Sequence, residues 1–433
     1  MFLTTYFFYS IKKFFYIAYF NEMWYYITMS KIDEFSGSVL VDNMEELNKI
    51  LIADNGQQKV AIELFDIKTN DTKNYDLLAS VAKNIENLIK NGLKEIDLVV
   101  PYERLPKKEF AKICEFAKKA DGKLKVNICV NHRRIDKESN YDKTKQVKWD
   151  IDTIIRANTE IDKVCNFIKE RNLSPLEALA FIHEYVGSVA EYNVSDVPNH
   201  SWKEKDQLFA GAYMKLPEVI CAGYSSLERE IIHSLNMPGL KCEVVSIEYD
   251  DEDEMEHFSH SRCYIEVNDT KYKINQSCFD DPTWDRKTKD TIGTYNCFAL
   301  SNKFYKEELN NRYRYRYPYF TKLNRNNFQF EIVDYDPSKD EYNKGENNID
   351  QSLIEKVYFS MLQKIDHNKS FREIYRIIEE KTECSAMYQK KYKYNGYFKS
   401  DTPELTKQEA RSIYDKNVTI FSKNTETTND MNL

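Results

Sequence analysis

The hydrophobic and polar positions between residues 41 and 150 predict a small α/β domain. Three short apolar runs have the length of strands, at residues 60–65, 96–100 and 124–130. Apolar residues in the two stretches between them recur at helical spacing, over residues 77–89 and 106–117. Strands that alternate with helices in this way favour a parallel sheet. Residues 131–150 are dense in charge and show no period, so we expect a linker there.

The pattern changes in the region 151–330, where helices come first and strands follow. Helices are predicted over 152–170 and 174–186, and Ser174 and Glu177 form a capping box at the start of the second. A third helix and two strands are expected next, at residues 223–237, 240–247 and 261–267. This combination predicts an α+β domain that follows the α/β domain along the chain.

The last hundred residues are predominantly helical in pattern. Helices are expected near 351–383 and 404–415, and a polar tail follows them. The chain is therefore predicted to have four parts. They are an aromatic N-terminal extension, the α/β domain with its linker, the α+β core and a helical C-terminal region, over residues 1–40, 41–150, 151–330 and 331–433.

Composition narrows the classes of function and location. The chain has 433 residues, 62 Lys and Arg against 70 Asp and Glu, and this mild acidity argues against a nucleic-acid partner. Its nine cysteines are scattered without a Cys-x-x-Cys pair, which predicts neither a disulfide framework nor a zinc ribbon. A reducing compartment follows most simply, so we expect a cytoplasmic protein.

Two charged segments have an ordinary structural interpretation beside a functional one. Arginine and tyrosine alternate over residues 312–318, which suits a single-stranded nucleic acid but is equally the pattern of a half-buried strand. The acidic net charge favours the strand. The acidic segment 248–256 is expected to be a solvated hairpin tip, although it could also attract a basic substrate segment.

The first 29 residues are strongly aromatic, but Lys12 and Lys13 divide them into apolar stretches too short to span a bilayer. The same lysines stand where a signal peptide needs an apolar core. We expect no integral membrane span and a non-native upstream extension, with the start near Met23 or Met29. The alternatives are a peripheral membrane anchor or export through this aromatic segment.

Three residues that together can make a thiolate nucleophile occur in the order Cys221, His260, Asp281. Cys221 lies at or just before the start of the helix predicted from Gly223. The helix N-terminus and a cationic histidine both favour the thiolate over a thiol whose ordinary pKa is about 8.5. Asp281 would accept the second ring N–H of His260 and favour the imidazolium. The alternative for Asp281 is a turn opener before Pro282.

The segments around these residues resemble those of the transglutaminase-like superfamily, in its bacterial-type domains. Cys-Ala-Gly-Tyr-Ser from Cys221, His260 with the strand after it, and Asp-Pro-Thr-Trp-Asp from Asp281 match its three motifs, within roughly residues 175–300. The resemblance implies a papain-like core, in which a helix-borne Cys packs on an antiparallel sheet. Arg262 stands where the family often has an aromatic residue. Asn275 is an alternative to Asp281 as the third residue of the triad.

Other residues of these segments are expected to shape the site. We assign substrate contacts to Gly223, Tyr224 and Trp284. Gly223 admits close approach of an acyl group, Tyr224 suits packing more than catalysis, and Trp284 suits the core or a pocket wall. His257, His260 and Cys263 have ligand-like spacing, but on a strand His260 and Cys263 point to opposite faces, so we expect no metal.

The resemblance and the residues together predict acyl transfer by a cysteine nucleophile on a peptide or glutamine carboxamide. The enzyme would be a transglutaminase, a deamidase or a protease, would form a thioester and would need no cofactor. Its expected partner is a protein or peptide substrate. The alternative is an inactive transglutaminase-like fold that serves as a protein-interaction module. The sequence specifies neither the acyl acceptor nor the oligomeric state.

Overall fold

The protein is described by a computed structural model. It covers residues 38–53, 59–65, 73–100, 107–136, 141–193, 208–215, 217–250, 257–286, 293–301, 314–315, 319–324, 329–334, 349, 351–392 and 405–429. The fold is mixed α+β, as predicted. The chain divides into two compact units, residues 1–155 with 324–329 and residues 156–323 with 330–433. The expected N-terminal extension lies almost entirely outside the described residues.

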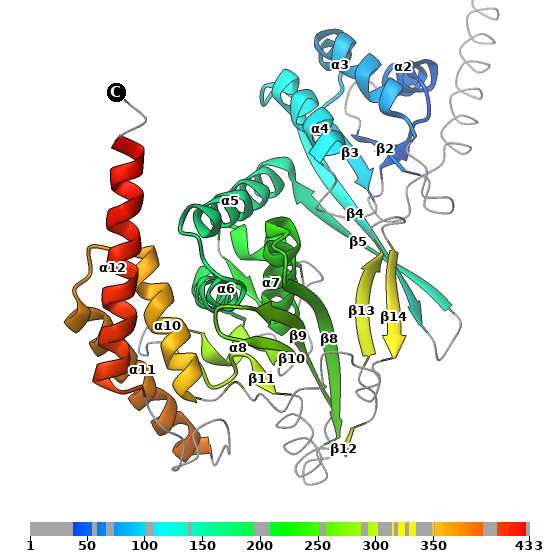
Figure 1. The fold of residues 1–433 in the computed structure, drawn as a ribbon. Helices are drawn as coiled ribbons and strands as arrows, with labels where there is room; N and C mark the ends of the chain where they lie inside the picture. The colour runs from blue at the N-terminus through cyan, green and yellow to red at the C-terminus, as the bar shows by residue number, and fades with distance from the viewer. Residues whose placement is uncertain are drawn as a thin grey trace, which may run out of the picture. The chain divides into compact units, whose positions relative to one another are not determined.

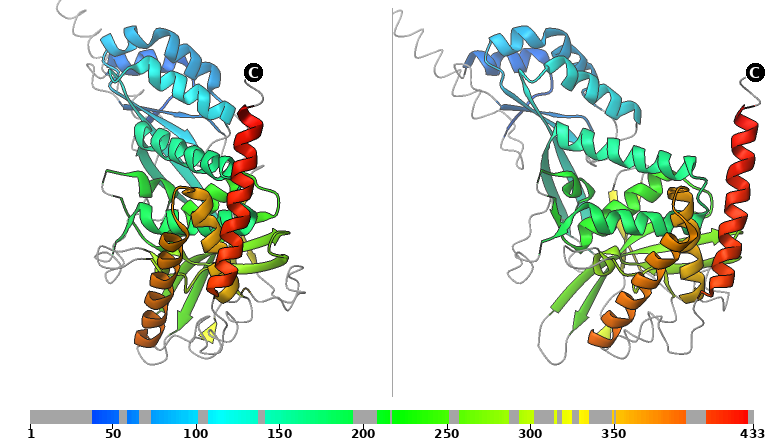
Figure 2. Two further views of the ribbon diagram at one scale, coloured as in Figure 1. Left: turned by 60° about the vertical axis from the view of Figure 1, so that its left-hand side comes forward. Right: turned by 90° about the vertical axis from the view of Figure 1, so that its left-hand side faces the viewer.

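The first unit contains the predicted parallel sheet. Its four parallel strands follow chain order and are β1 (Val39–Leu40), β2 (Lys59–Glu63), β3 (Glu95–Val100) and β4 (Lys125–Asp136). Three helices connect them, α2 (Met44–Ala53), α3 (Tyr75–Lys90) and α4 (Lys107–Ala120). The helices lie together on one face of this sheet (Figures 1 and 2), as right-handed crossovers in one direction require. The predicted strand and helix pattern is therefore confirmed.

The predicted linker at 131–150 is wrong. β4 runs on to Asp136, and β5 (Tyr141–Asp150) pairs with it antiparallel along its whole length. The end of β5 does alternate, because Val147 and Trp149 are buried while Lys148 lies between them on the other side. The sequence prediction missed this short alternation because most residues around it are charged.

The charges near this hairpin form a compact cluster within the first unit. Lys148 Nζ lies 2.7 Å from Glu95 Oε1 and 2.7 Å from Asp97 Oδ1. Asn127 donates to both carboxylates at 2.7 Å, and the Ser38 hydroxyl donates to Asp97 at 2.7 Å. These contacts explain how Asp97, which is fully buried, is tolerated in the middle of a sheet.

The second unit is built on an antiparallel sheet. Its central strands are β8 (Leu240–Asp250), β9 (His257–Asp269) and β10 (Ile274–Asp280), which pair in that order. Shorter strands are β11 (Leu300–Ser301) beside β10, β12 (Arg314–Tyr315) and β13 (Tyr319–Asn324) beside β8, and β14 (Gln329–Asp334). The two strands predicted here are confirmed. β8 extends to Asp250, into the acidic segment 248–256, and β9 begins at His257, directly after that segment. Of the 312–318 run, only β12 lies within the described residues.

Helices pack against this sheet and against one another. They are α5 (Ile151–Glu170), α6 (Pro175–Val189), α7 (Cys221–Leu235), α8 (Pro282–Asp285), α10 (Gln351–Ile365), α11 (Phe371–Tyr392) and α12 (Lys407–Asn429). α7 contacts β8 and β9, and α6 lies between α7 and α10 (Figures 1 and 2). The C-terminal helices thus belong to the same compact unit as the sheet. Among the helices that the structure describes, none is both long and apolar enough to cross a bilayer.

Candidate active site

Cys221 is the first residue of α7, as the sequence indicated. The helix is held by the buried side chains of Leu227, Ile231 and Leu235, and it starts after Ile220, which provides no side-chain cap. The first N–H groups of a helix have no partner within it, so an uncapped N-terminus leaves them for another acceptor. The Cys221 side chain, 8% exposed, lies at this end.

His260 lies in β9, which begins at His257, so the alternation that separates His260 from Cys263 applies. The Cys263 thiol donates to the backbone oxygen of Ser225 in α7 at 3.2 Å, whereas the imidazole of His260 faces Cys221 and Asp281. The two side chains therefore contact different residues of α7. No group of three potential metal ligands occurs among the described residues.

Asp281 follows β10 directly and caps the one-turn helix α8. Its Oδ2 lies 2.6 Å from His260 Nε2, and its Oδ1 accepts from the Thr283 N–H at 3.2 Å. The strand register explains this contact, because Asp280 is paired with Cys263 and the next residue therefore comes level with the His260 end of β9. Asn275, the rival, is exposed and pairs with Asn268 at the other end of β10.

The three groups favour a charged pair. Burial raises the pKa of the Cys221 thiol, but the His260 charge, a hydrogen bond from His260 and the Ser261 N–H outweigh it, so the pKa is lowered. Burial lowers the pKa of His260, whereas Asp281 and Cys221 raise it to about 9. Burial also raises the pKa of Asp281, and its contacts with His260 and Arg262 lower it overall. These contacts therefore favour a thiolate beside an imidazolium over a neutral thiol beside a neutral imidazole.

Arg262 has a place in this arrangement that the sequence did not predict. Its Nε lies 3.6 Å from Asp281 Oδ2, and its side chain is 14% exposed. The guanidinium is therefore a second cation on the carboxylate that holds His260. The departure from the family motif at this position adds a charge beside the site, where an aromatic ring would add none.

Trp284 forms a wall of the site that is open to solvent. It is 50% exposed, and its ring centroid lies 5.6 Å from that of His260. Its indole Nε1 is 3.0 Å from His260 Nε2, the nitrogen that also faces Asp281. An indole N–H is only a donor, so it bonds Nε2 only when that nitrogen carries no proton; in the imidazolium the Nε2 proton is directed to the carboxylate.

The geometry does not support substrate contacts by Tyr224. The N–H of Gly223 is hydrogen-bonded within the helix. Tyr224 is 1% exposed, and its hydroxyl donates to the Ala190 carbonyl at 2.7 Å. The Gly223 N–H donates to the Ile220 carbonyl at 2.9 Å, within the first turn. The assignment of Tyr224 to substrate binding is therefore corrected: its ring is packed in the core next to Cys221 and its hydroxyl is hydrogen-bonded, as is usual for a buried tyrosine.

We expect Tyr224→Phe to lower the free energy of unfolding by about 1–2 kcal/mol, because it leaves the Ala190 carbonyl without its donor. The rate at which Cys221 is alkylated should not change. Urea denaturation and mass-spectrometric labelling of the same preparation test both statements. A large loss of Cys221 reactivity without a loss of stability would contradict this correction and support a role of Tyr224 in substrate binding.

No protein-family model matches the chain, and no curated protein matches it significantly in sequence. The chemistry of the site therefore rests on its own residues.

Two side chains near Cys221 were not singled out by the sequence. Tyr192 stacks on Tyr224 with centroids 6.3 Å apart, and burial and the neighbouring Cys221 both raise the pKa of its hydroxyl. The guanidinium carbon of Arg286 lies 4.8 Å from the Tyr192 ring centroid. Arg286 therefore places a positive charge against the ring of a residue that neighbours Cys221. Neither residue lies in the three motifs, so no sequence signal indicated them.

Proposed function

We propose that the protein is a cysteine-dependent acyl transferase of the transglutaminase-like type, with a papain-like core. The observation that carries this proposal is the run of contacts from Cys221 to His260 to Asp281, which ends in the 2.6 Å contact between His260 Nε2 and Asp281 Oδ2. Nucleophile, base and orienting carboxylate are thus in hydrogen-bonding order. The substrate class that suits these groups is a peptide or glutamine carboxamide.

Acylation starts from the thiolate and imidazolium pair. The Cys221 sulfur attacks the carbonyl carbon, and the tetrahedral oxyanion collapses to a thioester as the C–N bond breaks. Because Nε2 of His260 is held by Asp281, the proton that the leaving nitrogen needs comes from Nδ1. A glutamine carboxamide would release ammonia, and a peptide bond would release an amine.

Deacylation reverses the proton transfer. The neutral imidazole takes a proton at Nδ1 from water or from an amine, whose oxygen or nitrogen attacks the thioester carbon. The carbon–sulfur bond breaks, and Cys221 leaves as the thiolate. Water gives the carboxylic acid and an amine gives a new amide. Asp281 stays ionised throughout and keeps His260 oriented.

The start of α7 supports the same reaction. The backbone N–H of Cys221 stands at the first position of an uncapped helix, where it can donate to the oxyanion of the tetrahedral intermediate. The partial positive charge of the helix N-terminus also favours both the thiolate and the oxyanion. These groups are in place before any substrate binds.

The pH dependence of Cys221 alkylation by iodoacetamide tests the proposal without a known substrate. We expect rapid labelling below pH 7, because the Cys221 pKa is lowered. Cys114 is an internal control in the same digest: it is only partly exposed, and burial raises its pKa, so its labelling should begin in the alkaline range. Mass spectrometry distinguishes the two sites.

The opposite result is equally clear. If Cys221 and Cys114 follow the same alkaline profile, the thiol is not activated, and the fold is better regarded as an interaction module that keeps the arrangement without the chemistry.

A further inference from the structure

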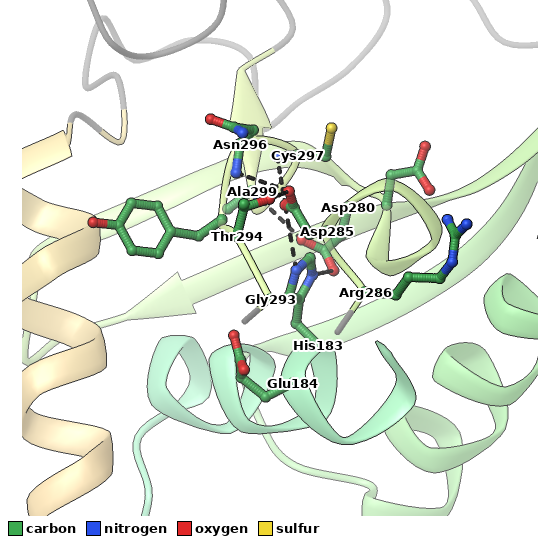
Figure 3. A network of polar contacts seen from close by, with 12 residues as sticks. His183, Glu184, Asp280, Asp285, Arg286, Gly293, Thr294, Asn296, Cys297 and Ala299 are labelled. Carbon is green, nitrogen blue, oxygen red and sulfur yellow. Dashed lines mark hydrogen bonds and ion pairs between the residues drawn. The ribbon is translucent and has the colours of Figure 1, made fainter. Parts of the chain in front are cut away.

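A second buried polar network lies directly behind the triad. His183 of α6 stands between two carboxylates, with Nδ1 at 2.7 Å from Asp280 Oδ2 and Nε2 at 3.4 Å from Asp285 Oδ2 (Figure 3). His183 is 2% exposed, and Asp280 and Asp285 are 0% and 4% exposed. Neither carboxylate belongs to the triad, but they lie on either side of Asp281 along the chain.

The network carries charge in a place that water does not reach. Burial lowers the pKa of His183, but Asp280 and Asp285 together raise it to about 10, so it is an imidazolium at neutral pH. Backbone N–H groups share the negative charges: those of Asn296 and Cys297 donate to Asp285 at 3.0 and 2.6 Å, and that of Ala299 donates to Asp280 at 2.8 Å. Figure 3 shows these donors gathered on the far side of the two carboxylates from His183.

Glu228 links this network to the helix of the nucleophile. It follows Cys221 by two helical turns in α7 and is fully buried beside Asp280 and the Cys263 thiol. Burial and these two neighbours raise its pKa well above the ordinary value, which favours the neutral carboxylic acid beside Asp280. One side chain of the Cys221 helix thus contacts the neighbour of Asp281 and a residue of the His260 strand. Tyr358 of α10 also faces Asp280 and Asp285.

The segment 280–286 is fixed to α6 at more than one point. Gly187, one turn after His183, lies so close to this segment that an added Cβ would stand 3.2 Å from the Arg286 Cα. Asp280 and Asp281 direct their carboxylates to different histidines, one to His183 and the other to His260. A shift of the segment by the length of a hydrogen bond would break both contacts.

We propose that His183 is a positioning residue: by bridging Asp280 and Asp285 it fixes the short segment that directs the Asp281 carboxylate at His260. Glu228 of α7 contributes to the same network through its position beside Asp280. The inference rests on the proposed function, because it assigns His183 a part in activating Cys221. A network that merely holds the core together would affect stability and leave the triad unchanged.

The test compares two variants of the network with the wild type by the pH profile of Cys221 alkylation. His183→Gln keeps one hydrogen bond to Asp280 but cannot bridge the two carboxylates. Asp285→Asn is the milder change, since it keeps an oxygen for the backbone donors, and it provides the measurement if His183→Gln does not fold. We expect the His183→Gln midpoint to rise by about one pH unit, a tenfold lower rate at acidic pH, and a smaller rise for Asp285→Asn.

Glu355→Gln is the matched control. Glu355 is a buried carboxylate of the same unit that accepts from the Leu405 N–H at 2.6 Å and from the Thr382 hydroxyl at 3.0 Å. Its loss should lower the melting temperature and leave the labelling profile in place. The positioning role is overturned if wild-type Cys221 labels below pH 7 and the network variants keep its midpoint, however unstable they are. A wild type that labels only at alkaline pH instead overturns the proposed function, and this inference with it.

Discussion

Replacing His260 by alanine is expected to slow the alkylation of Cys221 at pH 6 by at least about tenfold. An ordinary thiol is only about 0.3% ionised at that pH, and without the imidazolium the burial of Cys221 raises its pKa further. The gain in thiolate in the wild type is partly offset, because a thiolate of lower pKa is a weaker nucleophile. For the same reason the two profiles should cross, with the variant reacting faster than the wild type in strong alkali. Labelling rates between pH 5 and 10, resolved by mass spectrometry, measure both effects.

His233→Ala is the matched control for that experiment. His233 is another partly buried imidazole of the same unit, on α7, and it contacts the Cys242 carbonyl at 2.8 Å. Its removal should leave the Cys221 profile unchanged. Equal rates at pH 6 for His260→Ala and the wild type would mean that the imidazole does not set the state of the thiol.

Local periodicity accounts for what the sequence predicted well. The face made by Leu227, Ile231 and Leu235 predicted α7, and the motifs indicated that Cys221 lies at a helix start and that His260 lies next to a strand. These features depend on neighbours within a few positions along the chain. The contact between Asp281 and His260 was expected because the residue types and the motif suggested it, and the register of β9 and β10 provides it.

What the sequence missed depends on pairs that are far apart along the chain. His183 is separated from Asp280 by 97 positions, and its helix was identified by its capping box and its apolar face, neither of which involves His183. Lys148 finds its partners Glu95 and Asp97 more than fifty residues away, so its segment looked like a charged linker. A charge that is buried and paired in the fold has the same appearance in the sequence as one that faces water.

Removing the charge of Glu177 is expected to be among the most destabilising single changes in the second unit. Glu177 is fully buried in α6, and its carboxylate lies 2.5 Å from Lys271 Nζ and 2.8 Å from Lys364 Nζ. It also accepts from the Ser174 N–H at 2.8 Å, in the capping box that the sequence predicted. Glu177→Gln leaves the two ammonium groups without their counter-ion, so we expect the free energy of unfolding to fall by about 3 kcal/mol at pH 7.

The loss should depend on pH in a defined direction. Burial raises the pKa of Glu177, but the two lysines more than compensate and lower it to about 2, against an ordinary value of 4.5. Because the folded pKa is the lower one, the stabilisation is complete above pH 4.5 and disappears as the pH falls from 4.5 towards 2. The difference between the wild type and Glu177→Gln, measured by urea denaturation, should be constant from pH 5 to 8 and shrink below that range.

Glu160→Gln separates this effect from the loss of an exposed charge. Glu160 lies 2.7 Å from Lys163, a distance like those at Glu177, but the two side chains are 36% and 66% exposed. Solvent screens such a pair, so its loss should lower the free energy of unfolding by less than about 1 kcal/mol. The prediction is contradicted if both variants lower the free energy of unfolding by the same small amount. In that case solvent stabilises Lys271 and Lys364 without Glu177, and burial of the carboxylate does not make this contact important for stability.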